Sequence, residues 1–350
     1  MSSTFAFPSP VGGVGLAGDF VPSVLFAILY ASLLPIFCFR LVNKQSRAIL
    51  GISAVLTCVE RVVIFSLRAK QSQTPGLQTS GTLVTYMQVT IALAYIAVAQ
   101  DTVSLLRCVY VNSTKGPTPS DLDNFDSPVG TTSSSQIPLS PSRGNKTFPE
   151  NDGELLSDQP RRRAFYRRWT DALRLAFLVA TASGIVGNVH YKGGMNSVST
   201  ANEVMVTRMG SRYVSSGISL ILIVLVAVLV VRARRLPRVR PIHVILILAM
   251  LACNASSAIF RLSFMGNRTT SLTSTASGSG NTVSEKVTFY IFHMFSDWLA
   301  CFLFLVPNIK ETFNTGMWGD WRSTDPPPEN SALSKKKKGL YFGRANLVVV

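Results

Sequence analysis

A chain of 350 residues with 47% hydrophobic and only 15% charged residues lacks the composition of a soluble domain, in which about a quarter of residues are charged. The formal net charge is +16, and the cations stand in short runs between apolar segments. This placement is typical of a membrane protein that follows the positive-inside rule. It argues against a nucleic-acid-binding surface, so we expect no nucleic acid among the partners.

Seven apolar segments are each long enough to cross a bilayer as a helix, at about 1.5 Å per residue. They span residues 20–42, 48–67, 82–111, 169–190, 212–231, 242–262 and 285–307. The third is longer than a crossing requires, which a tilt or a projection from the membrane accommodates. The predicted fold is therefore all-α: a polytopic membrane protein with a bundle of seven transmembrane helices.

The orientation of the bundle follows from its Lys and Arg residues. Residues 1–19 have neither a positive leading region nor an early apolar run, so the first helix is expected to direct insertion. The side that holds residues 112–168 and 308–350 is the more basic one, and the positive-inside rule makes it cytosolic. We expect residues 1–19 outside the cytosol and the C-terminus within it, with helices one to three in residues 20–111 and four to seven in 169–307.

The two long cytosolic segments have the composition of disordered chain. Residues 112–168 are rich in Ser, Pro and charge, and most of the tail is polar or basic. One basic run extends from Arg161 to Arg168 and another from Lys335 to Lys338. Each run either binds anionic lipid headgroups, at ~1 kcal/mol per charge, or only fixes the topology.

The loop between the sixth and seventh helices carries a glycosylation sequon at Asn267. It lies on the predicted outer side, so a glycan is expected there. Two further sequons, at Asn112 and Asn145, lie on the predicted cytosolic side and are expected to stay unmodified.

The second segment carries Glu60 and Arg61 near its middle. A charged side chain at bilayer depth costs at least a few kcal/mol, so it faces protein or internal water. Asn254, His293 and Asp297 reach the same zone from the sixth and seventh helices, with Asp297 one turn deeper than the others, as estimated from the rise of a helix. These five residues form the candidate intramembrane polar site, in which Arg61 is expected to pair with Glu60 or, given its reach, with Asp297.

Asp101 lies near the cytosolic boundary of the third helix. We expect it to form a structural ion pair with an arginine such as Arg107 or Arg235. The three histidines lie at different depths and the five cysteines lie inside apolar segments without metal-binding spacing, so neither a metal site nor a cofactor is expected.

Several stretches are similar to a fungal family of seven-helix membrane proteins of unknown function. They are residues 12–15 and 19–22 before the first helix, 60–69 in the second and 289–291 at the start of the seventh. More distantly, the layout resembles the fungal lipid-translocating exporter family. That resemblance implies lipid movement or a response to lipid stress, and it supplies no catalytic residue.

Three functions are compatible with these features. The first is an integral protein of the plasma membrane or an endomembrane that binds or moves lipid-like or amphipathic molecules through the polar site. The second is a receptor-like sensor whose basic loop 232–240 contacts a cytosolic partner. In the third, the polar residues form a purely structural network that fixes helix packing. An intramembrane hydrolase is only weakly supported, since several His ligands at one depth are missing.

Overall fold

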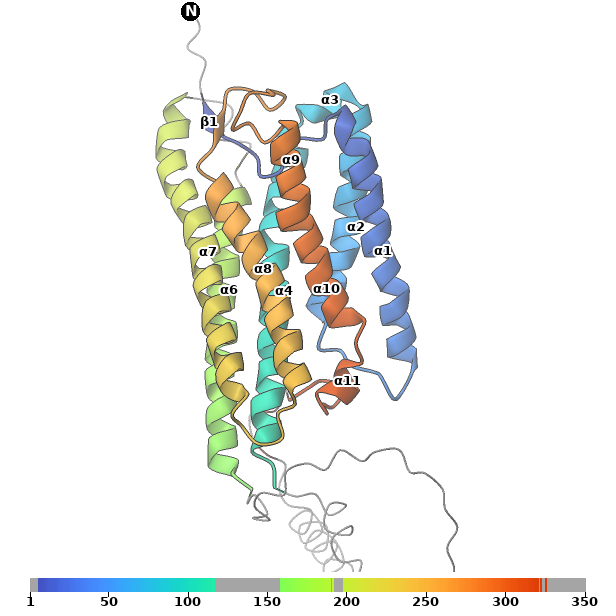
Figure 1. Ribbon diagram of the computed structural model, residues 1–350. Helices are drawn as coiled ribbons and strands as arrows, with labels where there is room; N and C mark the ends of the chain where they lie inside the picture. The colour runs from blue at the N-terminus through green and yellow to red at the C-terminus, as the bar shows by residue number, and fades with distance from the viewer. Residues whose placement is uncertain are drawn as a thin grey trace, which may run out of the picture.

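The computed structural model describes residues 6–116, 158–189, 191, 198–320, 322 and 325, without the side chains of residues 198–208. Long helices run side by side along an elongated bundle (Figure 1). They are α1 (Phe20–Val42), α2 (Ile52–Gln73), α4 (Gly81–Ser113), α6 (Pro160–Val189), α7 (Val198–Ala233), α8 (Pro241–Phe264) and a last helix built from α9 (Val283–Phe289), η3 (Tyr290–Phe295) and α10 (Ser296–Leu305). The short elements are β1 (Phe7–Pro8), η1 (Ala17–Asp19), α3 (Pro75–Gln78), β2 (Arg268–Thr269) and α11 (Ile309–Thr312).

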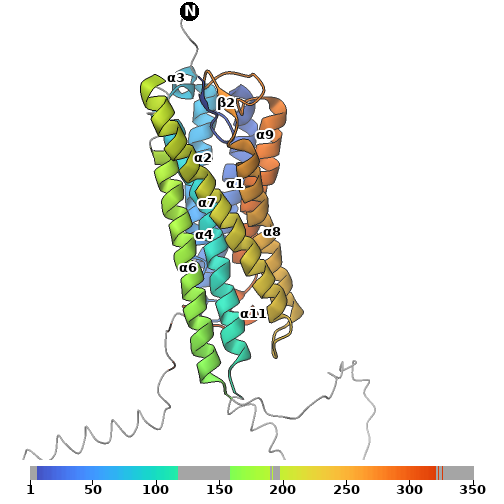
Figure 2. The same ribbon diagram turned by 90° about the vertical axis from the view of Figure 1, so that its left-hand side faces the viewer.

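Helix α4 is the centre of the bundle. It packs against α2, α6, α7, α8 and α10, and most of its residues from Met87 onward are buried. Neighbouring helices contact one another in the order α1, α2, α4, α6, α7, α8, α10, and α10 returns to α1 and α2. Figure 2 shows α4 lying beside α6 and α7 over much of its length. A helix enclosed in this way has no solvated face, so its polar side chains, such as Gln88, Asp101 and Arg107, are buried among its neighbours.

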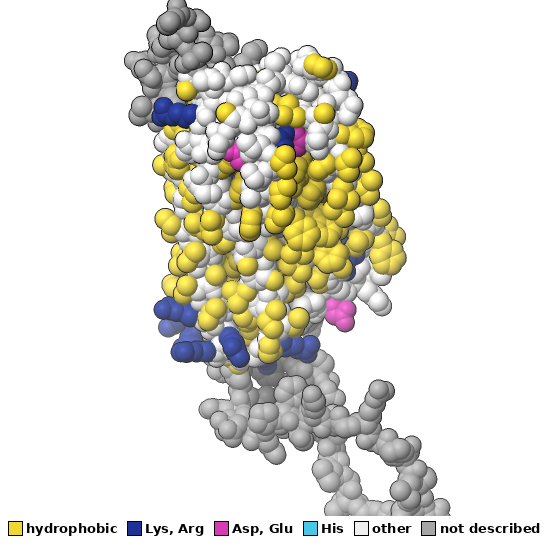
Figure 3. Space-filling model, turned by 45° about the horizontal axis from the view of Figure 1, so that its top comes forward, with side chains coloured by type: hydrophobic (Ala, Val, Ile, Leu, Met, Phe, Trp, Pro, Cys, Tyr) yellow, Lys and Arg dark blue, Asp and Glu magenta, His cyan; other side chains and the backbone are white. Residues whose placement is uncertain are grey.

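The outer surface of the bundle is apolar, as expected for a protein solvated by lipid. Large hydrophobic side chains such as Val21, Leu25, Leu56, Leu175 and Ile221 are exposed. Figure 3 shows hydrophobic side chains over the middle of one face and Lys and Arg gathered near one end. Six of the described helices are long and apolar enough to cross a membrane. The protein is therefore an integral membrane protein.

Helix α2 is the one predicted crossing that does not meet this criterion. Its 22 residues reach about 33 Å at the α-helical rise, but they include four charged side chains from Glu60 to Lys70 among other polar groups. It lies between α1, α4 and α10, which shield its polar face. The seventh crossing remains a prediction.

We call the end formed by residues 6–19, 74–80 and 265–282 the outer end, and the end formed by residues 43–51, 234–240 and 306–320 the inner end. These names follow the predicted orientation. Helix α6 begins at Pro160, so residues 160–168, expected to close the cytosolic loop, form its first turns instead. Asn145 and the run from Lys335 to Lys338 lie outside the described residues.

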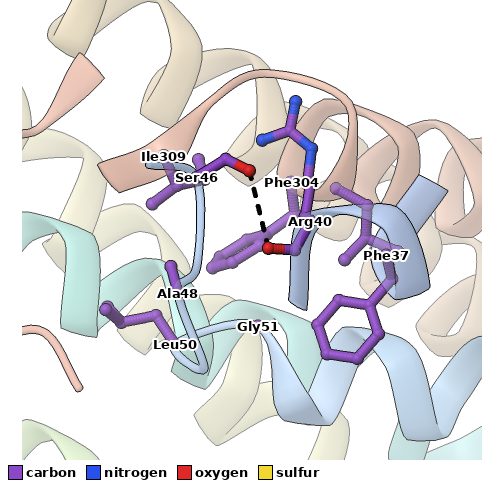
Figure 4. A pocket seen from close by; sticks show the side chains of 9 residues that line it. Phe37, Arg40, Ser46, Ala48, Leu50, Gly51, Phe304 and Ile309 are labelled. Carbon is purple, nitrogen blue, oxygen red and sulfur yellow. Dashed lines mark hydrogen bonds between the residues drawn. The ribbon is translucent and has the colours of Figure 1, made fainter. Parts of the chain in front are cut away.

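A close contact of backbone with aromatic rings fixes the inner end of α2. Gly51 precedes this helix, and a Cβ atom placed on it would lie 2.8 Å from the ring of Phe304 on α10. Figure 4 shows the pocket that Gly51, Phe37, Phe304 and Ser46 line together. The hydroxyl of Ser46 donates to the carbonyl of Arg40 at 3.5 Å. The turn between α1 and α2 is therefore packed directly onto the end of the last helix.

Candidate functional site

A fully buried ion pair joins α2 to α10. Arg61 donates from Nε to Oδ2 of Asp297 at 2.8 Å, and its Nη2 lies 2.8 Å from the same oxygen. The Tyr30 hydroxyl on α1 also donates to this oxygen, at 3.3 Å. Arg61 thus pairs with Asp297, one of the two partners that the sequence left open. Arg61 Nη1 and Asp297 Oδ1 have no hydrogen-bond partner.

The pair shows that the depths estimated from the sequence were wrong by about one turn. Asp297 was expected to lie a turn deeper than Arg61, yet the two are level. Helix α2 begins at Ile52 rather than at residue 48, which moves Arg61 about 6 Å toward the inner end. His293 therefore lies one turn farther out than this pair.

Among the described residues, three of the five predicted site residues, Glu60, Asn254 and His293, form no hydrogen bond with the pair. Glu60 is half-buried, and no hydrogen bond or ion pair involves it in the described part of the chain. Adjacent residues on a helix point about 100° apart, so the burial of Arg61 turns Glu60 away from the core. Asn254 is buried and donates to the carbonyl of Met250 on its own helix at 3.0 Å, while its Oδ1 has no partner.

His293 occupies a π-helical turn in the last helix. Segment η3 (Tyr290–Phe295) contains it, and both of its ring nitrogens are buried without a hydrogen-bond partner. The ring lies among those of Tyr95, Phe260 and Phe289, with centroids 5.8–6.2 Å away. Hydroxyls of α8 bond carbonyls of this turn, Ser257 to that of His293 at 3.3 Å. Such single π-helical turns occur frequently at functional sites.

Two further arginines lie in the same half of the bundle, and the sequence analysis missed their role. Arg261 on α8 and Arg212 on α7 are 1% and 2% exposed. Neither forms an ion pair in the described part of the chain, and two nitrogens of each guanidinium have no hydrogen-bond partner. Arg261 lies within electrostatic range of Arg212, Arg61 and the Tyr95 hydroxyl.

Their positions in the sequence explain the omission. Arg212 opens the fifth predicted segment and Arg261 stands one residue before the end of the sixth. Cations at such positions usually reach the membrane surface. Here α7 extends outward to residue 198, so Arg212 lies well inside it, and Arg261 lies in the last turn of α8 but is buried. A cation in the first or second position from the end of an apolar segment was the available signal.

Above this cluster, the N-terminal segment closes the outer end. Arg68 on α2 bonds the carbonyls of Gly12 and Gly13 and lies 3.4 Å from Asp19. Asp19 also accepts from Lys286 and, at 2.9 Å, from the Tyr290 hydroxyl. Arg68 and Lys286 are thus both engaged inside the fold. The segment is therefore fastened to α2 and to the last helix.

Asp101 does not form the ion pair expected from the sequence. Its Oδ2 accepts the backbone N–H of Ala54 at 3.2 Å, and no ion pair of Asp101 occurs among the described residues. Ala54 lies in the first turn of α2. The N–H groups at a helix N-terminus have no partner within the helix, so they bond a carboxylate such as that of Asp101 directly. Arg107, proposed as its partner, instead binds Asp171 and Asp320.

A network of arginines and aspartates fastens the C-terminal segment under the inner end. Arg167 on α6 binds Asp320 with two bonds of 2.8 Å and Asp325 with a third. Arg163 binds Asp325 at 2.6 Å, and Arg107 lies 3.2 Å from Asp320. Burial raises the pKa of Asp320, but hydrogen bonds and charges from Arg167 and Arg107 outweigh it and lower the pKa below its usual range. We call these five residues the inner clasp.

The inner clasp changes the interpretation of the basic run that starts at Arg161. Arg163 and Arg167 are buried by their aspartate partners, so they are not available to lipid headgroups. Arg161, Arg162 and Arg168 are exposed.

No family model, curated protein or solved structure matches the chain. The site is therefore interpreted from its own geometry.

Proposed function

We propose that this membrane protein binds an amphipathic molecule with an anionic group in the outer half of its bundle. The observation that carries the proposal is the uncompensated charge of Arg212 and Arg261. Among the described side chains of this half, four buried arginines face two buried aspartates, Asp19 and Asp297, and both aspartates are already paired. The two remaining guanidiniums need a negative partner.

The energetics of buried charge support an anionic ligand. An isolated cation in a low-dielectric interior carries an effective penalty of several kcal/mol. Ionisable residues inside a membrane therefore mark binding sites by default. A guanidinium presents a planar fork of N–H donors that fits a carboxylate or phosphate. The two ring nitrogens of His293, which have no hydrogen-bond partner, are further hydrogen-bonding groups for the same ligand.

The surroundings support an apolar body on this ligand. The aromatic rings of Phe260 and Phe289 lie next to His293. An amphipathic molecule matches a site whose walls are aromatic and whose few polar groups are cationic or unpartnered. Lipid-like substrates, which the resemblance to the exporter family implies, have this character.

Binding is the step that transport and sensing share. Our first candidate for the event after binding is movement of a lipid-like molecule through the bundle. A sensor is the second, because the N-terminal segment is fastened over one end and the inner clasp over the other. Ligand binding would then be transmitted to the N-terminal segment or to the inner clasp.

Thermal unfolding of the purified protein in phosphatidylcholine nanodiscs tests the proposal. Alkyl carboxylates and alkyl phosphates should raise the melting temperature, and alkyl trimethylammonium of equal chain length should not. Arg261→Gln and Arg212→Gln should abolish the shift. Arg268→Gln, an exposed arginine in β2, is the matched control and should retain it.

A structural network predicts the opposite result. Arg261→Met would then stabilise the protein, since an apolar side chain replaces an unpaired charge, and no anionic amphiphile would shift either protein. That outcome would overturn the proposal.

A further inference from the structure

A basic cavity opens at the inner end, away from the polar cluster. Its volume is about 920 Å³. Three segments line it: residues 112–116 at the end of α4, residues 238–243 at the start of α8, and residues 311–314 in and after α11. It thus lies where three elements meet at the predicted cytosolic edge of the membrane.

The walls of this cavity are positively charged. Lys115, Arg238 and Arg240 line it with exposed side chains, against the single carboxylate of Glu311. None of these four forms an ion pair in the described part of the chain. This separates them from Arg163 and Arg167, whose charges the inner clasp neutralises. The cavity therefore has charge available for an anion.

The backbone around the cavity is held in an uncommon conformation. Among the described residues other than glycine, only Arg238 and Asn314 have a positive φ, of 64° and 46°, and both line this cavity. A left-handed conformation costs an L residue such as arginine about 1–2 kcal/mol. At position 238 the chain therefore places a guanidinium where a glycine would be less strained.

Hydrogen bonds keep the three walls together. Arg238 donates to the carbonyls of Lys115 and Gly116, at 2.7 and 3.2 Å. Asn112 donates to the carbonyl of Phe313 at 2.7 Å. His243 bonds the carbonyl of Thr312, and its ring stacks on Phe313. The cavity is formed in advance by bonds that join all three segments.

The cavity also adjoins the lipid-facing surface. Ile242 and Ile245, in the first turns of α8, are exposed and apolar. A helix that turns apolar side chains outward directly beside a basic cavity places that cavity at headgroup level. The bilayer therefore presents its headgroups at the mouth of the cavity.

We propose that this cavity binds the phosphorylated headgroup of an anionic membrane lipid. Basic pockets between helices on the cytosolic side take such headgroups. The volume lies in the range of ligand sites and accommodates a phosphorylated sugar ring. Arg238 and Arg240 bind the phosphate oxygens, and Lys115 adds a third charge from the opposite wall. The site is independent of the cluster around Arg261.

The test uses the full chain in nanodiscs of phosphatidylcholine, with or without a phosphatidylinositol bisphosphate. The melting temperature should rise with the phosphoinositide and rise much less with phosphatidylserine. Arg238→Gln and Lys115→Gln should each weaken apparent binding roughly fivefold, the value of one charge near a headgroup. Glu311→Gln should strengthen it by removing the opposing charge.

Controls separate a built site from general attraction to an anionic surface. Arg234→Gln and Arg235→Gln change exposed arginines of the same loop that do not line the cavity, so they should retain full binding. Equal losses in these controls would overturn the proposal. So would a shift produced equally by soluble inositol phosphate or inorganic phosphate, because the ligand would then not be a lipid. A cavity that recognised a cytosolic protein instead would show no dependence on the phosphoinositide. Arg238→Gln also removes the bonds to Lys115 and Gly116, so Lys115→Gln is the deciding variant. It removes no bond between the walls and must melt like the unaltered protein in phosphatidylcholine alone.

Discussion

At the scale of single residues, the Arg61–Asp297 pair decides how α2 can sit among its neighbours. Both side chains are fully buried, and Asp297 is the sole carboxylate within hydrogen-bonding distance of Arg61 among the described residues. A buried ion pair adds little net stability compared with an apolar pair of the same volume. Its main effect is that the loss of either partner leaves an unpaired buried charge, which strongly destabilises the fold.

Asp297→Asn should therefore destabilise the protein by about 3–5 kcal/mol, because it leaves the charge of Arg61 unpaired. The double variant Arg61→Met with Asp297→Leu should recover most of that loss. The free energy of unfolding in detergent is the quantity to measure. Additive losses in this cycle would exclude the pairing, and Arg268→Met, at an exposed position, provides the baseline.

The candidate site was only partly predictable from the sequence. Arg61 and Asp297 stood out because each interrupts a long apolar run, which few residues in a membrane protein do. Arg212 and Arg261 were missed because a cation near a segment end resembles an interfacial anchor. Glu60 was overvalued, since an apolar run shows depth along the helix but not which face of α2 is buried.

At the scale of elements, the N-terminal segment depends on two adjacent glycines in left-handed conformation. Gly13 has a φ of +61°, and a Cβ atom on it would lie 2.3 Å from the carbonyl oxygen of Gly280. Backbone cannot move aside as a side chain can. The contact therefore fixes the segment against the loop that precedes α9.

Gly13→Ala should detach this segment, at a cost above the roughly 1–2 kcal/mol of the left-handed backbone alone. Limited proteolysis should then cut within residues 6–16 at a protease level that leaves the unaltered protein whole. Gly18→Ala is the matched control, because nothing lies within 4 Å of the added methyl group. Equal resistance of both variants would show that the segment is held without this contact.

The inner clasp gives the protein a defined response to acid. Neighbouring arginines lower the pKa of Asp320 and Asp325. A carboxylate with a lowered pKa in the folded state contributes stability that is fully present above its unfolded pKa of about 4 and is lost as the pH falls through the folded value.

Asp320→Asn with Asp325→Asn should therefore lower the melting temperature at neutral pH. The difference from the unaltered protein should shrink as the pH falls below about 4. Melting curves of both proteins over this pH range provide the measurement. A difference that stays constant down to about pH 2 would show that the aspartates act through packing rather than charge.

At the scale of the whole molecule, the helical, membrane-embedded architecture was predictable and its details were not. Apolar length and placement of cations indicated the long helices, because a bilayer leaves the backbone few alternatives. Helix ends were displaced by four to fourteen residues at α2, α6 and α7, since polar residues continue a helix beyond the apolar core. The π-helical turn at His293 left no pattern in the sequence.

The predicted orientation can be tested on one residue. Asn267 lies at the outer end beside β2, and its backbone carbonyl accepts from Ser9. Expression in eukaryotic cells should yield a glycan that Asn267→Gln removes, seen as a mobility shift sensitive to glycosidase. A glycan on Asn145 in its place would invert the orientation.

The partner of Arg61 lies 236 residues farther along the chain, in the last long helix. A ribosome must therefore make nearly the whole bundle before the charge on α2 meets its counter-ion. Until then α2 is too polar to be stable alone in lipid, so it must stay in the insertion machinery or packed against α1. Any truncation before Ser296 should leave α2 exposed to quality control, so the last helix acts as a checkpoint for the second.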